Sequence, residues 1–312
     1  MFRLASSALF RPEALSVFEL EAPTLGISSD SAHVDFINSR LVADGILKIR
    51  LGFSDEKSQY LEQIIRQLHT NHGHGLPITH SASRGWFWDV RPTAPFQQST
   101  ISAPSSAMPT STQARSETME EFPWHTDCSY ELSPPRYFAL HVLHHDRCNG
   151  GTTSILRVQE LLQSLSPGTK YALSRPDFRI EVPPEFTKNG NERYITSSLL
   201  QEPSLTPTNP QLRFRQDIIT PLTTDATKAL QELKAGFNRI EVQKAMLHLT
   251  PELLPKGSII LIDNRRWLHA RNEVKDPKRH LRRVRWDAAP FTSENSLDQV
   301  QVAAASQQSG TL

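Results

Sequence analysis

His125 and Asp127, in the segment FPWHTD, are the residues whose types and spacing point most directly to chemistry. An imidazole and a carboxylate two residues apart on an extended strand face the same side, so one element would supply two metal ligands. A third ligand must come from elsewhere, and His269 is the best candidate because it follows the strongly apolar segment 258–264. Two histidines and one carboxylate leave three positions open on an ion, which suits iron(II).

The segment between this apolar strand and His269 contains Arg265, Arg266 and Trp267. We interpret these residues as the point where the chain emerges from the core. His72 and His74 form a rival pair, but they lie in NHGHG, where flanking glycines make a preorganised ligand site unfavourable and indicate a turn.

Arginines follow the third histidine at a spacing that could serve an acidic ligand. Arg279 and Arg283 lie after the turn KDPK, on a predicted strand whose alternation puts both on one face. A guanidinium binds a carboxylate two oxygens at a time, so one of them could hold a dicarboxylate co-substrate and the other an anionic group of the substrate. The alternative is a solvated edge strand protected by its charges, which would also include Arg282 and Arg285.

Short predicted strands dominate the second half of the chain, with a few helices among them. A strand is expected at 45–50, followed by a helix with Ser54 as N-cap and an apolar stripe of Tyr60, Leu61, Ile64, Ile65 and Leu68. Further expected strands are 137–143, 151–156, 178–182, 194–195, 213–219, 258–264 and 280–288, with helices at 158–165 and 225–237. This pattern indicates a mainly β sandwich or barrel with flanking helices.

The expected organisation is an N-terminal extension at 1–44, one domain at 45–292 and a disordered tail at 293–312. Residues 94–121 are rich in Ser, Thr, Pro and Gln, which predicts a flexible insertion that either acts as a lid or has no special role. Trp86 and Trp88 could line a substrate mouth, but aromatic clusters of this kind usually belong to a core.

Composition excludes several classes of protein. The formal net charge of the 312 residues is +1, without the basic patch of a nucleic-acid binder, and no apolar run is long enough for a membrane span. Two cysteines give no disulfide framework and favour a reducing compartment. We therefore expect a cytoplasmic protein that binds a small molecule, with a mitochondrial location as the weaker alternative and no prediction of oligomeric state.

Four separated motifs resemble those of the taurine dioxygenase and clavaminate synthase group of iron(II)/2-oxoglutarate oxygenases, the TauD/TfdA family. WHTD resembles its His-x-Asp element, and GGTT at 150–153 resembles Gly-Gly-Asp-Thr, with Thr153 at the position that touches 2-oxoglutarate. IDNRRWLHAR resembles the segment with the distal histidine, and RHLRR resembles the Arg-x-x-x-Arg strand of Arg279 and Arg283. Thr152 departs from the usual acid.

The resemblance implies a double-stranded β-helix, the cupin-like jelly roll, with iron(II) held by His125, Asp127 and His269. It also implies that Arg279 anchors 2-oxoglutarate, that Arg283 faces the substrate or the first carboxylate of the co-substrate, and that oxygen is consumed while succinate and carbon dioxide are released. Hydroxylation or desaturation of a small, anionic organic substrate is the expected reaction. A zinc-dependent hydrolase with the same three ligands and an inactive jelly-roll binding protein are the alternatives.

Overall fold

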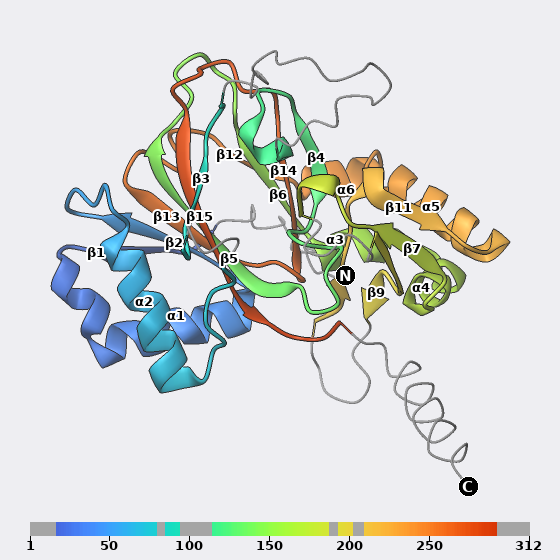
Figure 1. Cartoon of the computed structure of the whole chain (residues 1–312), viewed down its shortest axis with the longest axis horizontal. Coiled ribbons are helices and arrows are strands. Elements are labelled where there is room, and N and C mark those ends of the chain that lie inside the picture. The colour runs from blue at the N-terminus through green and yellow to red at the C-terminus, as the bar shows by residue number, and fades with distance from the viewer. Residues whose placement is uncertain (1–16, 80–84, 94–113, 187–192, 202–208, 292–312) are drawn as a thin grey trace, which may run out of the picture.

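The computed structural model describes residues 17–79, 85–93, 114–186, 193–201 and 209–291 (Figure 1). The described part is mainly β with some helices, as predicted. The expected tail at 293–312 and most of the expected insertion at 94–121 lie outside the described residues.

Two larger sheets form the centre of the molecule. The six-stranded sheet has the order β1-β2-β13-β5-β15-β3, and the four-stranded sheet has the order β12-β6-β14-β4. The strands of the six-stranded sheet are β1 (Glu19–Ala22), β2 (Ile46–Leu51), β13 (Ser258–Asp263), β5 (Pro135–His144), β15 (His280–Ala288) and β3 (Trp88–Val90). Those of the four-stranded sheet are β12 (Leu247–Leu249), β6 (Thr153–Arg157), β14 (Trp267–Arg271) and β4 (Phe122–His125).

Smaller elements surround these sheets. The order β11-β7-β8 makes a three-stranded sheet and β10-β9 a two-stranded one. Their strands are β11 (Ile219–Pro221), β7 (Phe178–Glu181), β8 (Tyr194–Ser197), β10 (Gln211–Leu212) and β9 (Leu200–Gln201). The α-helices are α1 (Ser31–Asp44), α2 (Gln59–His72), α3 (Val158–Gln163), α4 (Pro167–Ser174), α5 (Thr224–Gly236) and α6 (Ile240–Lys244), and the 3-10 helices are η1 (Leu25–Ser29), η2 (Arg115–Glu117), η3 (Pro184–Phe186) and η4 (Gln216–Ile218).

Strand β5 lies in the middle of the larger sheet and has apolar side chains on both faces. Tyr137 and Ala139 pack with α1 and α2, whereas Phe138 and Leu140 pack toward the four-stranded sheet. Because side chains alternate along a strand, one element can support two cores. Figure 1 shows α1 and α2 together at one side of the molecule and α4 and α5 at the opposite side. The interior between the two larger sheets is where the candidate site lies.

Helix α2 confirms one sequence prediction and corrects another. Its five predicted apolar positions are all buried. The N-cap prediction was wrong, because Ser54 lies before the helix and the carboxylate of Asp55 accepts hydrogen bonds from the backbone amides of Gln59 and Tyr60 at 2.8 and 2.9 Å. Two acceptor oxygens on one side chain satisfy two free N–H groups of the first turn, which a serine hydroxyl at Ser54 cannot do from its position.

The predicted single strand at 213–219 was also wrong. The chain there passes from β10 through η4 into β11, and β10 and β11 belong to different sheets. Helix α1 was not predicted, and neither was β1. Since β1 pairs in parallel with β2, and Val34, Ile37 and Leu41 of α1 join the core of the larger sheet, residues 17–44 pack against the predicted domain. The domain boundary itself stays a prediction.

The aromatic cluster of 86–88 belongs to the core. Trp88 lies buried on β3 among apolar side chains, and Trp86 packs at the edge of the core beneath the guanidinium of Arg66. Within the described ranges, none of the helices combines the length and apolar character needed to cross a membrane.

Candidate active site

Strands β4 and β14 place the two predicted histidine ligands side by side. They pair antiparallel with His125 opposite His269, and the two ring centroids lie 4.0 Å apart. His269 therefore lies on a strand of the four-stranded sheet. The interpretation of the preceding residues as an emergence from the core was wrong, because Arg265, Arg266 and Trp267 are all buried. The two arginines are retained there by hydrogen bonds to backbone carbonyls, from Arg265 to Pro134 and from Arg266 to Leu41.

Asp127 lies just after β4, at the start of a turn, and not on the extended strand assumed from the spacing. Asn264 fixes this turn from the other side of the site. Its side-chain oxygen accepts a hydrogen bond from the backbone amide of Asp127 at 2.7 Å, and its side-chain nitrogen donates to the Asp127 carbonyl at 2.9 Å. Thr126 is also held by the backbone of Phe214. The carboxylate therefore faces the histidines because of specific contacts to the turn.

The three side chains form a compact donor set. Each of His125, Asp127 and His269 offers a ligand atom, and these atoms all lie within 4.8 Å of one another. The Nε2 atoms of His125 and His269 lie 3.8 and 3.7 Å from Oδ1 of Asp127. Nδ1 of His125 lies 2.7 Å from the carbonyl oxygen of Pro123, so it is the protonated nitrogen and Nε2 keeps its lone pair. This donor set fits an iron(II) ion.

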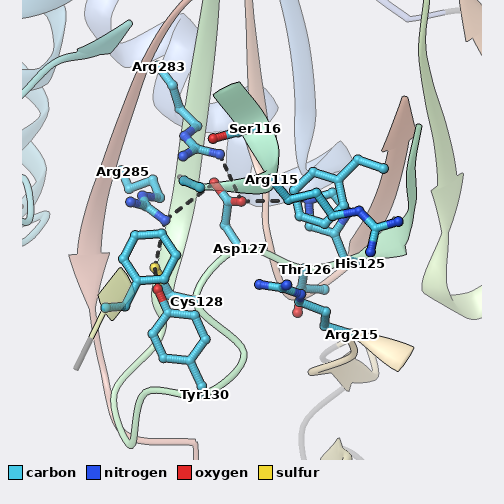
Figure 2. Close-up of a pocket in the computed structure, with 13 residues that line it drawn as sticks. Arg115, Ser116, His125, Thr126, Asp127, Cys128, Tyr130, Arg215, Arg283 and Arg285 are labelled. Atoms are coloured by element: carbon cyan, nitrogen blue, oxygen red, sulfur yellow. Dashed lines mark hydrogen bonds and ion pairs between the residues drawn. The ribbon is translucent and has the colours of Figure 1, made fainter. Parts of the chain in front are cut away.

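Two buried arginines balance the charge of Asp127. Nη1 of Arg283 lies 3.2 Å from its Oδ1, and Nη1 of Arg285 lies 3.9 Å from its Oδ2 (Figure 2). Burial alone would raise the pKa of Asp127, but the positive charges of Arg283 and Arg285 outweigh it and hold the pKa well below its usual range. For His125, burial and the neighbouring imidazole lower the pKa well below 6.5. The carboxylate is consequently ionised and this imidazole neutral, as metal ligation requires.

One pocket extends from the triad toward Arg279, and we call it the co-substrate pocket after the ligand that the sequence predicts for that arginine. It is lined by His125, His269, Thr153, Arg271, Arg279 and Arg283, together with Ser116 and apolar residues. Arg279 donates from Nε to the Gly151 carbonyl at 3.1 Å, while its buried Nη1 has no hydrogen-bond partner among the described residues. Burial, with the nearby charge of Arg271, lowers the pKa of Arg279 to about 9. A buried cation with a free donor fits a carboxylate ligand.

Gly151 explains part of the GGTT motif. Its φ of +62° is in the left-handed region, and a Cβ built there would lie 2.5 Å from Cδ and Nε of Arg279. The position therefore needs glycine for its backbone conformation and for the passage of the arginine stem. Thr152 stands where the family motif has an acid, but its backbone still anchors the loop. The amide of Thr152 donates to Oδ1 of Asn272 at 2.6 Å.

A second pocket opens on the other side of Asp127, and we call it the substrate pocket. It shares Ser116, Phe122, His125 and Arg283 with the co-substrate pocket. Figure 2 shows Arg283 and Arg285 on one side of Asp127, His125, Arg115 and Arg215 on the other, and Cys128 with Tyr130 below. Phe122 stacks on His125 at a centroid distance of 3.6 Å, and Tyr130 stacks on Phe186 at 5.4 Å. These rings give the pocket apolar walls.

All six predicted site residues therefore lie in one place: the three metal-ligand candidates stand together, and Thr153, Arg279 and Arg283 line the adjoining pocket. The edge-strand reading of the arginine cluster is wrong for three of its members. Strand β15 has neighbours on both sides, and Arg279, Arg283 and Arg285 are only 3, 6 and 2% exposed. The prediction that Arg279 shares this strand with Arg283 was wrong, because Arg279 directly precedes β15. Only Arg282 points outward, to Asp89.

Sequence reasoning missed several residues of the site. Asn264 and Arg271 were unassigned although both lie within the IDNRRWLHAR segment, and Arg285 was seen only as part of the cluster. Arg271 follows His269 by two positions on β14, so strand alternation could have placed it on the same face. No sequence signal singled out Tyr130, Phe186 or Arg215, because loops bring them to the pocket.

The chain belongs to the taurine catabolism dioxygenase TauD, TfdA family, whose profile matches residues 79–285. This confirms the family predicted from the four motifs, and it supports neither the zinc hydrolase nor the inactive binding protein. L-asparagine oxygenase of Streptomyces coelicolor is 31% identical over 150 residues, a match that covers 48% of this chain and 41% of the relative. The aligned part is thus less than half of that enzyme.

Solved structures share the fold at low sequence identity. The structure of an asparagine oxygenase in complex with Fe(II), 2S,3S-3-hydroxyasparagine and succinate has a TM-score of 0.60 at 20% identity, covering 84% of this chain and 79% of that one. The non-heme iron oxygenase OrfP in complex with Fe and alpha-ketoglutaric acid has a TM-score of 0.57 at 19% identity, covering 81 and 78%. At these identities the likeness concerns the fold.

Proposed function

We propose that this protein is an iron(II)- and 2-oxoglutarate-dependent dioxygenase that oxidises a small, anionic organic substrate and releases succinate and carbon dioxide. The observation that carries the proposal is the position of the His125, Asp127 and His269 cluster where two pockets meet, one of which ends at the buried Arg279. The relatives support it, since solved members of the neighbouring group are described with iron, 2-oxoglutarate and succinate.

The fold that we propose is a double-stranded β-helix. Its eight strands would be β3 to β6 and β12 to β15, divided equally between the two larger sheets. Apart from the step from β6 to β12, successive strands of this set alternate between the sheets. Side chains of both sheets share one apolar cluster, including Phe138, Ile155 and Trp267. Alternation of this kind is expected of a jelly roll.

The residues have separate tasks in this proposal. His125, Asp127 and His269 would hold iron(II), which with 2-oxoglutarate and oxygen supplies the oxidising chemistry. Arg279 and the Thr153 hydroxyl would bind the distal carboxylate of 2-oxoglutarate, and Arg283 would lie between the co-substrate and the substrate. Arg283 and Arg285 keep Asp127 ionised, and the apolar walls exclude water, so both acids stay oriented toward the same centre.

Anaerobic spectroscopy tests this function. Iron(II) and 2-oxoglutarate added to the protein without oxygen should produce a visible metal-to-ligand charge-transfer band, and oxygen with substrate should then release succinate. Arg279→Gln should weaken 2-oxoglutarate binding in this titration by about 10- to 100-fold, because a charged hydrogen-bond partner is lost. Arg282→Gln, at an outward-facing position of β15 three residues after Arg279, is the control and should bind normally. Absence of the band from the wild-type protein would refute the proposal.

A further inference from the structure

Two loops cross between the larger sheets beside Arg279. Residues 145–152 lead from β5 to β6, and residues 272–279 lead from β14 to β15. Arg279 is the last residue of the second loop, and its Nε donates to the carbonyl of Gly151 in the first. The position of this guanidinium therefore depends on how the two loops are held together.

The carboxylate of Asp146 lies between the two loops and is buried. Its Oδ1 accepts a hydrogen bond from the amide of Cys148 in its own loop at 2.7 Å. Its Oδ2 accepts hydrogen bonds from the amides of Lys275 and Asp276 in the other loop at 2.6 and 3.0 Å. Burial would raise the pKa of Asp146, but these amides, with that of Gly150, outweigh it and lower the pKa. One ionised side chain thus binds backbone donors of both loops.

The contacts of Asp146 continue to Arg279 through the backbone. The amide of Arg279 donates to the carbonyl of Asp276 at 2.9 Å, and the amide of Asp276 donates to Asp146. The carbonyl of Gly151 accepts from Nε of Arg279, and the amide of Gly151 donates to the carbonyl of Glu273 at 2.7 Å. The backbone of the arginine is therefore held by one loop and its guanidinium by the other.

We propose that Asp146 is a positioning residue for the co-substrate, because its carboxylate joins the two loops and thereby sets where the Arg279 guanidinium meets the distal carboxylate of 2-oxoglutarate. The inference rests on the proposed function, in which Arg279 binds that carboxylate. An ionised aspartate suits the task because it offers acceptor oxygens to both loops and has no donor. An asparagine of the same size would turn its NH2 group toward amide donors of one loop, which would lose their acceptor.

A pair of 2-oxo acids tests the inference by calorimetry on the full chain loaded with manganese(II). 2-Oxoglutarate and 2-oxopentanoate have the same five-carbon chain, but the second has a methyl group in place of the distal carboxylate. We expect the wild type to bind 2-oxoglutarate about 100-fold more tightly, since only this acid bonds to the buried cation. Asp146→Asn should narrow this preference by about tenfold by weakening 2-oxoglutarate alone, because the guanidinium is displaced. A general loosening of the fold would weaken both acids or neither.

Asp55→Asn is the matched control for a purely structural effect. Asp55 is also buried, and its carboxylate also accepts hydrogen bonds from two backbone amides, those of Gln59 and Tyr60. It lies at the start of α2, outside the residues that line the two pockets. Asp55→Asn should therefore lower stability but keep the full preference for 2-oxoglutarate.

Gly150→Ala keeps the test valid if Asp146→Asn fails to fold. A Cβ at this position would lie 2.7 Å from Oδ2 of Asp146. It would lie equally close to the carbonyl oxygen of Glu273 and the amide nitrogen of Lys275, so it would push the two loops apart without removing a charge. We expect a narrower preference here as well. Gly168→Ala is its control, since no atom lies within 4 Å of that Cβ position.

The outcomes separate the inference from the proposed function. A wild-type protein that binds the two acids equally would overturn the proposed role of Arg279 and this inference with it. A wild-type preference that Asp146→Asn and Gly150→Ala both keep in full would overturn the inference alone, and so would an equal loss of both acids in Asp146→Asn. A preference that narrows in these two variants and not in Asp55→Asn supports it.

Discussion

The two pockets that meet at His125 and Arg283 are built from different kinds of backbone. The co-substrate pocket is lined mostly from strands: Thr153 begins β6, His269 and Arg271 lie on β14, and Arg283 lies on β15. The substrate pocket is lined largely from turns and short helices, with Arg115 on η2, Phe186 on η3 and Tyr130 in the turn after β4. Sheet register fixes the side chains that line the co-substrate pocket, whereas individual contacts fix those that line the substrate pocket.

This difference separates what the family shares from what distinguishes its members. Strand register places a side chain through many backbone hydrogen bonds, so a strand-built pocket tolerates little change. Turns and loops accept substitutions and insertions more easily, which allows the substrate to differ between members with the same co-substrate. Substitutions in the strand-built co-substrate pocket should therefore alter the binding of 2-oxoglutarate, and substitutions in the turn-built substrate pocket should alter the binding of the substrate.

The largest effect is expected at His269, which lines the co-substrate pocket and belongs to the candidate metal-binding triad. His269→Ala removes one of the three proposed metal ligands, so succinate release should fall on the order of 1,000-fold whatever the substrate. His280→Ala is the control, since that ring pairs with Asp89 outside the pocket. Activity of His269→Ala within tenfold of the wild type would show that the metal is held elsewhere.

Gly151→Ala should affect the co-substrate side alone. The new Cβ would collide with the stem of Arg279 at a left-handed backbone position, so the KM for 2-oxoglutarate should rise by roughly 30- to 100-fold while substrate binding changes little. Gly257→Ala is a matched control because its φ is +84° and no atom lies within 4 Å of its Cβ position. Equal effects of the two substitutions on this KM would mean that backbone strain, and not Arg279, is responsible.

Asn264→Ala should affect the turn that carries Asp127 and lines the substrate pocket. It removes the hydrogen bonds to both backbone groups of Asp127, and we expect about 1–3 kcal/mol less stability and roughly tenfold weaker iron binding. Asn272→Ala is the comparison on the co-substrate loop, where the hydrogen bond to Thr152 is exposed and should matter less. Chemical denaturation and metal titration measure both quantities. Equal losses of stability and iron affinity in the two variants would contradict the distinction between the substrate pocket and the co-substrate pocket.

The smallest effect is expected at His141 on β5, a central strand of the six-stranded sheet. Burial lowers the pKa of His141 on β5 to about 4, from an ordinary value of 6.5. The unfolded chain therefore takes up a proton first as the pH falls, and stability declines from about pH 6.5 toward pH 4 with a slope of at most about 1.4 kcal/mol per pH unit from this group. Denaturation of metal-free protein should show a shallower decline for His141→Gln. An unchanged slope would exclude His141 as a cause.

The comparison of the two pockets also explains which elements and site residues were predictable from the sequence. Periodicity identified β5, β13 and β15, and motif order brought Thr153, Arg279 and Arg283 to the same candidate site as the histidines. The failures fall where tertiary contacts decide. Asp55, and not Ser54, accepts hydrogen bonds from the first turn of α2, and the chain from 213 to 218 forms a loop and η4 between β10 and β11. Asn264 and Phe186 carry no periodic signal, because their place depends on how loops meet.

Diffraction from crystals grown without oxygen in the presence of iron(II) and 2-oxoglutarate tests the central claim most directly. We predict one anomalous peak at the iron absorption edge, about 2.0–2.2 Å from Nε2 of His125, a carboxylate oxygen of Asp127 and a ring nitrogen of His269. Density for 2-oxoglutarate should extend from this peak to the guanidinium of Arg279. An iron peak away from these three side chains, or a co-substrate that does not reach Arg279, would contradict the account.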